Sequence, residues 1–158
     1  MIPGGSGVVI RRDDPTSPAL AHLLALHVAF GRAHTPAENA HVLEPAALAA
    51  DAIVFWTAWD HDALAGMAAL RELGPDHGEL KSMRTAPGHL RKGVARALLD
   101  HVVATARARG YARISLETGT AAPFAPANAL YERAGFADCA AFGGYPASPH
   151  NRFMTMVL

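Results

Sequence analysis

The sequence has little of what marks a disulfide scaffold, a general nucleic-acid binder or a membrane protein. Its single cysteine, Cys139, excludes an intrachain disulfide framework and a thiolate metal cluster. Basic and acidic residues number 14 each, so there is no basic excess of the kind that nucleic-acid binding needs. No apolar run approaches a membrane-spanning length, and the first residues, "MIPGGSGVVIRRDD", lack the apolar core of a signal peptide. We therefore expect a cytoplasmic protein with no membrane and no nucleic-acid partner.

The nine histidines do not form a pattern that would bind a metal. His22 and His27 are five residues apart, a spacing that suits neither one face of a helix nor the paired histidines of a zinc protease. His34 and His41 flank Pro36 in an expected loop. Because no histidine pair stands beside a carboxylate at a metal-ligand spacing, we expect no bound metal.

The order of the expected elements predicts an α/β fold in a single domain over residues 1–158. Hydrophobic periodicity and turn residues indicate six strands, at 7–12, 53–59, 63–70, 79–85, 112–118 and 152–158. They also indicate helices over about 18–30, 93–109 and 125–134, with a short one near 44–52. This order predicts one mixed sheet with helices on both faces, in which 79–85 and 112–118 are parallel neighbours.

Residue types alternate along the strand expected at 79–85. Strict alternation would place Leu80, Ser82 and Arg84 on one face of the sheet. It would place the remaining residues on the other face: Glu79, Lys81, Met83 and Thr85.

The stretch "HLRKGVARALL" (89–99) places small and basic residues where a helix is about to begin. A helix start exposes N–H groups without intrahelical acceptors and attracts anions. Gly93 and Ala95 are small enough to let a diphosphate approach those N–H groups. Three basic side chains would add charge-assisted contacts: Arg91, Lys92 and Arg96. The alternative is that the small residues serve close helix packing and that the charges only solvate the helix end.

Two motifs in this part of the chain resemble those of the GNAT superfamily of acyl-CoA-dependent N-acetyltransferases, over about Glu79 to Phe136. In that family, a loop of the form Gln/Arg-x-x-Gly-x-Gly/Ala binds the pyrophosphate of coenzyme A. Gly93 and Ala95 match its small positions, whereas Leu90 stands where Gln or Arg is usual. The second motif, Ala-x-x-Leu-Tyr-x-x-x-Gly-Phe, is matched in full by Ala127, Leu130, Tyr131, Gly135 and Phe136.

The family often has an Asn seven residues before the motif tyrosine, and this chain has Phe124 there instead. A contact to pantetheine is therefore expected to be missing, and Asn128 is not at the position that would replace it. More narrowly, "SMRTAPGHLRKGVA", "SLETG" and "FMTMVL" resemble a bacterial subgroup of small, mostly uncharacterised GNAT proteins.

The resemblance implies the acyl-CoA N-acyltransferase fold, with a single mixed and mostly antiparallel sheet, and acetyl-CoA as co-substrate. It also implies which residues contact the co-substrate: Met83, Arg84, Thr85, Arg91, Lys92, Gly93, Val94, Ala95 and Arg96. A homodimer is a frequent arrangement in the family.

Acetyl transfer to an amine needs a base, a stabilised oxyanion and a proton for the leaving thiolate. Tyr131 matches the family's general acid, and its alternative role is a packed core tyrosine. Glu79, which opens the strand before the loop, stands where some members carry their base. Glu117, at the end of the neighbouring strand, is a competing base or an acceptor ligand. Because an amine is itself a good nucleophile, Cys139 is expected to be a packed residue.

Residues that bind the acceptor are expected in the loop "HTPAENAHVL" (34–43), because this region forms the wall of the acceptor cleft in this fold. Glu38 and His41 are three residues apart and would share a face if a turn formed, so that they could recognise an ammonium group. The other interpretation of this segment is a solvated loop.

Two classes of function follow. The leading one is an N-acetyltransferase that moves an acetyl group from acetyl-CoA to a primary amine of a small molecule by direct attack in a ternary complex. The alternatives are transfer to a protein amine and a non-catalytic acyl-CoA-binding sensor.

Overall fold

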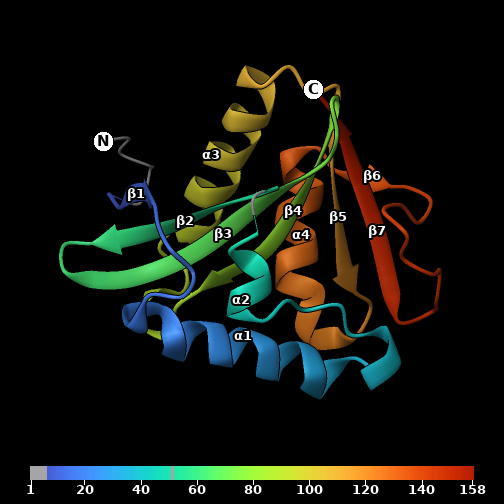
Figure 1. Cartoon of the computed structure of the whole chain (residues 1–158). Coiled ribbons are helices and arrows are strands. Elements are labelled where there is room, and N and C mark those ends of the chain that lie inside the picture. Colours follow the sequence, from blue (N-terminus) through green and yellow to red (C-terminus); the bar gives the residue numbers. More distant parts are fainter. Residues whose placement is uncertain (1–6, 51) are drawn as a thin grey trace.

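The computed structural model describes residues 7–50 and 52–158, and these form one seven-stranded sheet between two layers of helices (Figure 1). The strands lie in the order β1-β2-β3-β4-β5-β7-β6. Their bounds are β1 Val9–Arg12, β2 Ile53–Asp60, β3 Ala63–Gly74, β4 His77–Thr85, β5 Arg113–Gly119, β6 Ala137–Asp138 and β7 Asn151–Val157. Among these described strands, only the β4–β5 pair is parallel. The predicted mixed, mostly antiparallel sheet is confirmed.

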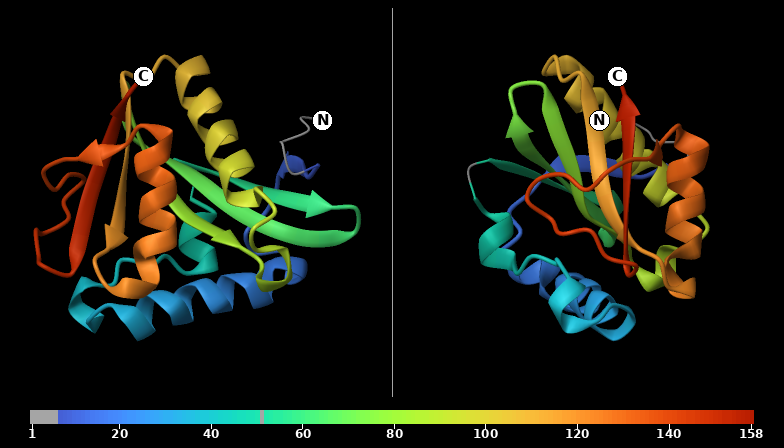
Figure 2. Two further views of the ribbon diagram at one scale, coloured as in Figure 1. Left: turned by 180° about the vertical axis from the view of Figure 1, so that it is seen from behind. Right: turned by 90° about the vertical axis from the view of Figure 1, so that its right-hand side faces the viewer.

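Each face of the sheet has its own hydrophobic core. α3 (Val94–Ala108) and α4 (Ala125–Ala134) cover one face, over the larger cluster that includes Trp56. α1 (Ala21–His34) and the short α2 (Pro45–Leu48) cover the other face, over the cluster that includes Phe55. Because side chains alternate along β2, these two aromatic neighbours enter opposite layers. The right-hand view in Figure 2 shows the sheet between the two pairs of helices.

The predicted helices over 93–109 and 125–134 are confirmed almost to the residue. The apolar stripe of α3 is buried, and Gly110, at φ 77°, ends the helix as the N–H of Tyr111 donates to the carbonyl of Ala106. Gly135 ends α4 in the same way, at φ 111°.

α1 is longer than predicted, because Gly31 does not interrupt it. The helix continues to His34, and Gly31 is buried against the following loop. A Cβ at this position would lie 2.6 Å from Cγ1 of Val42, so the glycine is needed for close packing rather than for a turn.

β4 contains a bulge at Ser82 that the alternation of residue types could not show. Ala69 and Met67 on β3 pair with Lys81 and Arg84 on β4, so β4 carries one extra residue. Ser82 takes a left-handed backbone conformation, φ 54°. The prediction that Arg84 faces away from Glu79 and that Met83 faces with it is therefore wrong. Met83 packs on the α3–α4 core, and Arg84 contacts His27 of α1.

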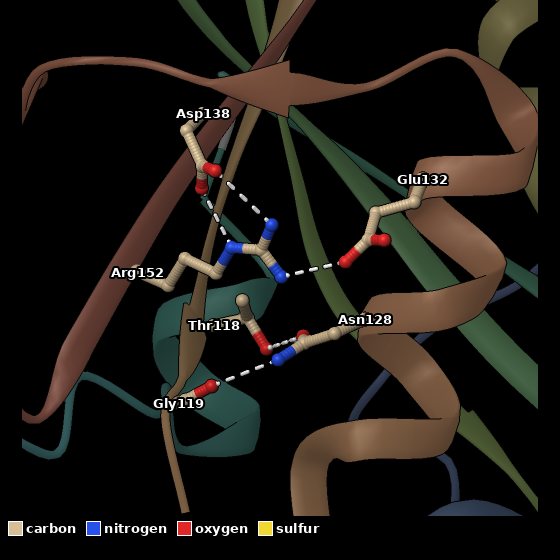
Figure 3. Close-up of polar contacts among 6 residues, drawn as sticks. All are labelled: Thr118, Gly119, Asn128, Glu132, Asp138 and Arg152. Carbon is tan, nitrogen blue, oxygen red and sulfur yellow. Dashed lines mark hydrogen bonds and ion pairs between the residues drawn. The ribbon is translucent and has the colours of Figure 1, made fainter.

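β4 and β5 begin side by side and then diverge. Their last paired residues are Leu80 and Leu116, although the strands continue to Thr85 and Gly119 (Figure 1). α4 is tied to the diverging end of β5: the amide of Asn128 accepts from Thr118 Oγ1 (2.8 Å) and donates to the carbonyl of Gly119 (3.0 Å) (Figure 3).

Two of the expectations from the sequence include residues that the structure does not describe. Residues 1–6 belong to the expected single domain over 1–158, and Asp51 belongs to the short helix expected near 44–52. Within the described residues, no helix is long and apolar enough to cross a membrane. No group of three or more metal-ligating side chains occurs there either.

Candidate active site

One cavity of about 760 Å³ lies where β4 and β5 diverge. It runs from the start of α3, past Tyr131 on α4, to the space between the sheet and α1. The volume is typical of small-molecule sites, and polar groups line both ends. This cavity is the candidate active site.

The outer end of the cavity has the features of an anion site. Arg91 and Gly93 both have left-handed backbone conformations, at φ 62° and φ 76°, so the chain turns sharply into α3. Helix geometry leaves the N–H groups of the first turn without intrahelical acceptors. Two basic side chains line this end, Arg91 and Arg96, and Arg96 also pairs with Asp100 at 3.0 Å. Backbone and charge here could hold a diphosphate.

Tyr131, on α4, is one of the residues that line the cavity. Its ring packs edge-on against Phe136 and is 8% exposed, so part of it belongs to the core. Burial raises the pKa of the phenol from 10 to about 12, although the charge of Arg84 opposes this rise. The hydroxyl therefore keeps its proton at any physiological pH and can act as a donor.

Glu79 is only 1% exposed, so it is not the solvated carboxylate that one interpretation of the sequence allows. It lies third in β4, which begins at His77 rather than at Glu79 as predicted. Tyr145 donates to its Oε2 at 2.7 Å, and Lys81 Nζ lies 3.4 Å from the same oxygen and 2.7 Å from Tyr145 Oη. Arg71 Nη1 approaches the other oxygen at 3.9 Å. Glu79 is thus the centre of a compact buried ion-pair network.

Glu117 lies on β5 beside this network, and a side-chain amide holds it. Asn151 Nδ2 donates to Glu117 Oε1 at 2.6 Å and also to the carbonyl of Asn39 at 2.9 Å. Burial raises the pKa of Glu117 from 4.5 to about 7, and the hydrogen bond from Asn151 partly offsets this rise. At neutral pH this carboxyl can therefore both take up and release a proton.

The inner wall toward α1 holds His27, Phe30 and Arg84. Arg84 Nε donates to His27 Nδ1 at 3.2 Å, and its guanidinium carbon lies 4.2 Å from the centre of the Phe30 ring. Burial and the neighbouring charges of Arg84 and Lys81 lower the pKa of His27 to about 4. His27 is therefore neutral at pH 7.

Most of the predicted site residues line the cavity, but two do not. Lys92 and Glu38 lie outside the lining, and Glu38 is exposed on the short helix Ala37–Asn39. His41 does line the cavity, and its ring lies 4.9 Å from that of Tyr145. The structure thus brings His41, but not Glu38, to the cavity. Cys139 also lies outside the cavity lining.

The sequence analysis missed two residues that line the cavity, His27 and Lys81, and two that hold its carboxyl groups, Tyr145 and Asn151. The alternation along β4 already places Lys81 on the face of Glu79, and this was a usable signal. Tyr145 and Asn151 come from the segment after β6, where no local pattern points to the cavity. Phe124, at the family's Asn position, packs edge-on against Phe30 at 5.1 Å.

The comparisons with known proteins agree with this geometry. A family model described as the acetyltransferase (GNAT) family matches residues 20–136. The chain belongs to the GNAT acetyltransferase family. It is accordingly an acetyl-CoA-dependent acyltransferase, as predicted.

The chain is 44% identical to the uncharacterized N-acetyltransferase YedL of Escherichia coli K12, over 94% of each chain. It is 46% identical to the uncharacterized N-acetyltransferase YsnE of Bacillus subtilis 168, over 94% of this chain and 99% of that one. A GNAT acetyltransferase of Elizabethkingia anophelis, solved with acetyl-CoA bound, shares the fold. Its TM-score is 0.71 at 18% identity, over 96% of this chain and 98% of that one.

The raised pKa of Glu117 predicts how the stability of this acetyltransferase depends on pH. Between pH 4.5 and about 7 the folded chain keeps a proton that the unfolded chain has lost, so stability falls as pH rises through this range. Glu117→Gln removes the buried charge. It should raise Tm at pH 8 by roughly 3–6 °C, and this gain should shrink toward pH 5.

Thermal melts of the two proteins at several pH values measure this effect. Glu38→Gln, a change of the same kind at an exposed position, is the matched control and should shift Tm little at any pH. A Glu117→Gln protein that is less stable than the wild type at pH 8 would contradict the assignment.

Proposed function

We propose that this enzyme transfers an acetyl group from acetyl-CoA to a primary amine of a small molecule, by direct attack of the amine within a ternary complex. The observation that carries the proposal is that one cavity joins an anion-binding helix start, a protonated tyrosine and a carboxyl that titrates near pH 7. The extension of the cavity into the space between the sheet and α1 favours a small acceptor over a protein chain.

The co-substrate fits the outer end of the cavity. Its diphosphate would lie at the start of α3, where Gly93 and Ala95 leave room beside the backbone N–H groups of the first turn. Arg91 and Arg96 would add charge. The backbone of β4 from Met83 to Thr85, beyond its last pairing with β5, would hold the acyl and pantetheine part.

Bound acetyl-CoA would supply an electrophilic thioester carbonyl and a thiolate leaving group. Glu117 is the residue that we assign as general base. Its pKa lies near the working pH, where a base combines a useful ionised fraction with proton affinity. Glu79 already accepts from Tyr145 and neighbours two cations, so we assign it to holding Lys81 and Tyr145 in place rather than to proton transfer.

Tyr131 is the residue that we assign to the leaving group. Its phenol has a pKa of about 12, whereas an ordinary thiol has one of about 8.5. Complete proton transfer to sulfur is therefore uphill, and the main contribution of Tyr131 is a hydrogen bond to the negative charge that develops on sulfur.

The test of this function is turnover. The purified protein, given acetyl-CoA and a panel of small primary amines, should release free thiol at a kcat that rises with pH through about 7. Glu117→Gln should lower kcat on the order of 10²-fold and remove that rise. Binding of acetyl-CoA without turnover of any amine would favour the alternative, a non-catalytic acyl-CoA-binding sensor.

Tyr131→Phe keeps the ring and removes only the hydroxyl. We expect kcat to fall on the order of 10²-fold while the affinity for acetyl-CoA barely changes. Tyr111→Phe, at a buried tyrosine outside the cavity lining, is the control and should leave kcat unchanged. An unaltered kcat for Tyr131→Phe, when chemistry limits turnover, would move the role to water.

Gly93→Trp should abolish binding of acetyl-CoA in calorimetry, because the side chain would occupy the space of the diphosphate. A side chain at this position is also strained by the left-handed backbone. Gly110→Trp is the matched control: it imposes the same strain, at φ 77°, at the other end of α3 and in open space. It should lower Tm and leave the affinity intact. Affinity like that of the wild type in Gly93→Trp would refute the placement.

A further inference from the structure

Arg84 is a cation at the inner end of the cavity whose partners are both uncharged. Its Nε donates to the neutral imidazole of His27, and Phe30 lies against its face. Burial lowers the pKa of the guanidinium, but an arginine keeps its proton in proteins. A partly desolvated charge is costly unless a counterion pairs with it.

The acidic groups near Arg84 are already engaged elsewhere. Glu79 pairs with Lys81 and accepts from Tyr145, and Glu117 accepts from Asn151. Among the described residues, no ion pair involves Arg84, and its Nη atoms donate to no protein acceptor. The planar end of the guanidinium is thus free to hold a bidentate anion.

The position of Arg84 relative to the reacting groups restricts what that anion can be. Arg84, Tyr131 and Glu117 all line the same cavity. The charges of Arg84 and Glu117 both act on Tyr131. The side chain of Arg84 lies on the α1 face of the sheet, where it contacts His27 and Phe30, whereas Met83 and the start of α3 lie on the opposite face. An anion on Arg84 would therefore belong to the acceptor rather than to the diphosphate of the co-substrate.

We propose that Arg84 binds the carboxylate of the acceptor, so that the amine substrates of this enzyme are amino carboxylates such as free amino acids. The inference rests on the proposed acetyl transfer and adds the acceptor class. The two ends of such a molecule match the two sides of the cavity: the carboxylate pairs with Arg84, and the ammonium faces Glu117. The covalent structure of such a molecule sets the distance between its carboxylate and its amine, so the ion pair with Arg84 positions the amine as well as binding the molecule.

The test compares acceptors that differ only in the carboxylate. L-leucine and L-phenylalanine are each paired with the corresponding amino acid amide and with the decarboxylated amine, 3-methylbutylamine or phenethylamine. We expect the wild type to favour the carboxylates on the order of 10²-fold in kcat/KM, the scale of one charge-assisted bidentate pair. Arg84→Met should remove this preference by lowering kcat/KM for the amino acids alone.

Two further variants keep the test decisive. Arg84→Lys retains the charge but loses the planar fork, so its preference for the carboxylates in kcat/KM should be smaller than that of the wild type and larger than that of Arg84→Met. If Arg84→Met folds poorly, the reduced preference of Arg84→Lys still tests the inference. Arg107→Met, at an exposed position on α3 outside the cavity, should leave the preference unchanged. Equal turnover of amino acids and decarboxylated amines by the wild type would overturn the inference and leave the proposed function standing.

Calorimetry measures the binding of the same compounds in the presence of coenzyme A. It therefore tests the carboxylate site independently of the proposed acetyl transfer. If no compound is acetylated but the amino acids bind, and Arg84→Met abolishes this binding, then the carboxylate site stands and the proposed catalysis fails. If the wild type binds the amino acids no better than their amides, the carboxylate site is overturned.

Discussion

The site depends on the place where β4 stops pairing with β5. If the two strands had stayed in register to Thr85 and Gly119, backbone hydrogen bonds would close the space between them. Instead, pairing ends at Leu80 and Leu116, and the bulge at Ser82 turns the end of β4. The unpaired end of β4 and the start of α3 then face the same cavity. The extra residue also brings Arg84 onto the face of the sheet that carries Glu79.

The titratable groups in this cavity take different protonation states because their surroundings differ. Glu79 is fully buried and neighbours Lys81 and Arg71. Glu117, whose main partner is the neutral amide of Asn151, has a pKa of about 7. Tyr131 has a pKa of about 12 and remains a donor. Burial and the choice of partner thus give neighbouring groups on one sheet different chemical roles.

Residues near the C-terminus hold both the site carboxyl groups and the neighbouring strands and helix in place. Tyr145 and Asn151, from the segment between β6 and β7 and the start of β7, hold Glu79 and Glu117. Arg152, the next residue, pairs with Asp138 and Glu132 and so ties β7 to β6 and α4 (Figure 3). A carboxylate that must ionise in a buried place destabilises the fold above pH 7, and such a cost is common at functional sites.

The sequence by itself determined the architecture and the outer half of the site. The buried stripe of α3, the glycines that end α3 and α4, and the small residues at 93 and 95 are local signals, because periodicity and backbone freedom act within a few residues. The two motifs also placed Tyr131. Tertiary structure alone decided how the residues of the inner half face and pair with one another. The bulge at Ser82 reversed the predicted faces of Met83 and Arg84, because a prediction from strict alternation assumes that no extra residue is inserted in the strand. Glu38 fell outside the cavity lining, and Tyr145 and Asn151 came to hold the cavity residues Glu79 and Glu117. Pairing between residues far apart in the chain leaves no pattern in the sequence around either partner.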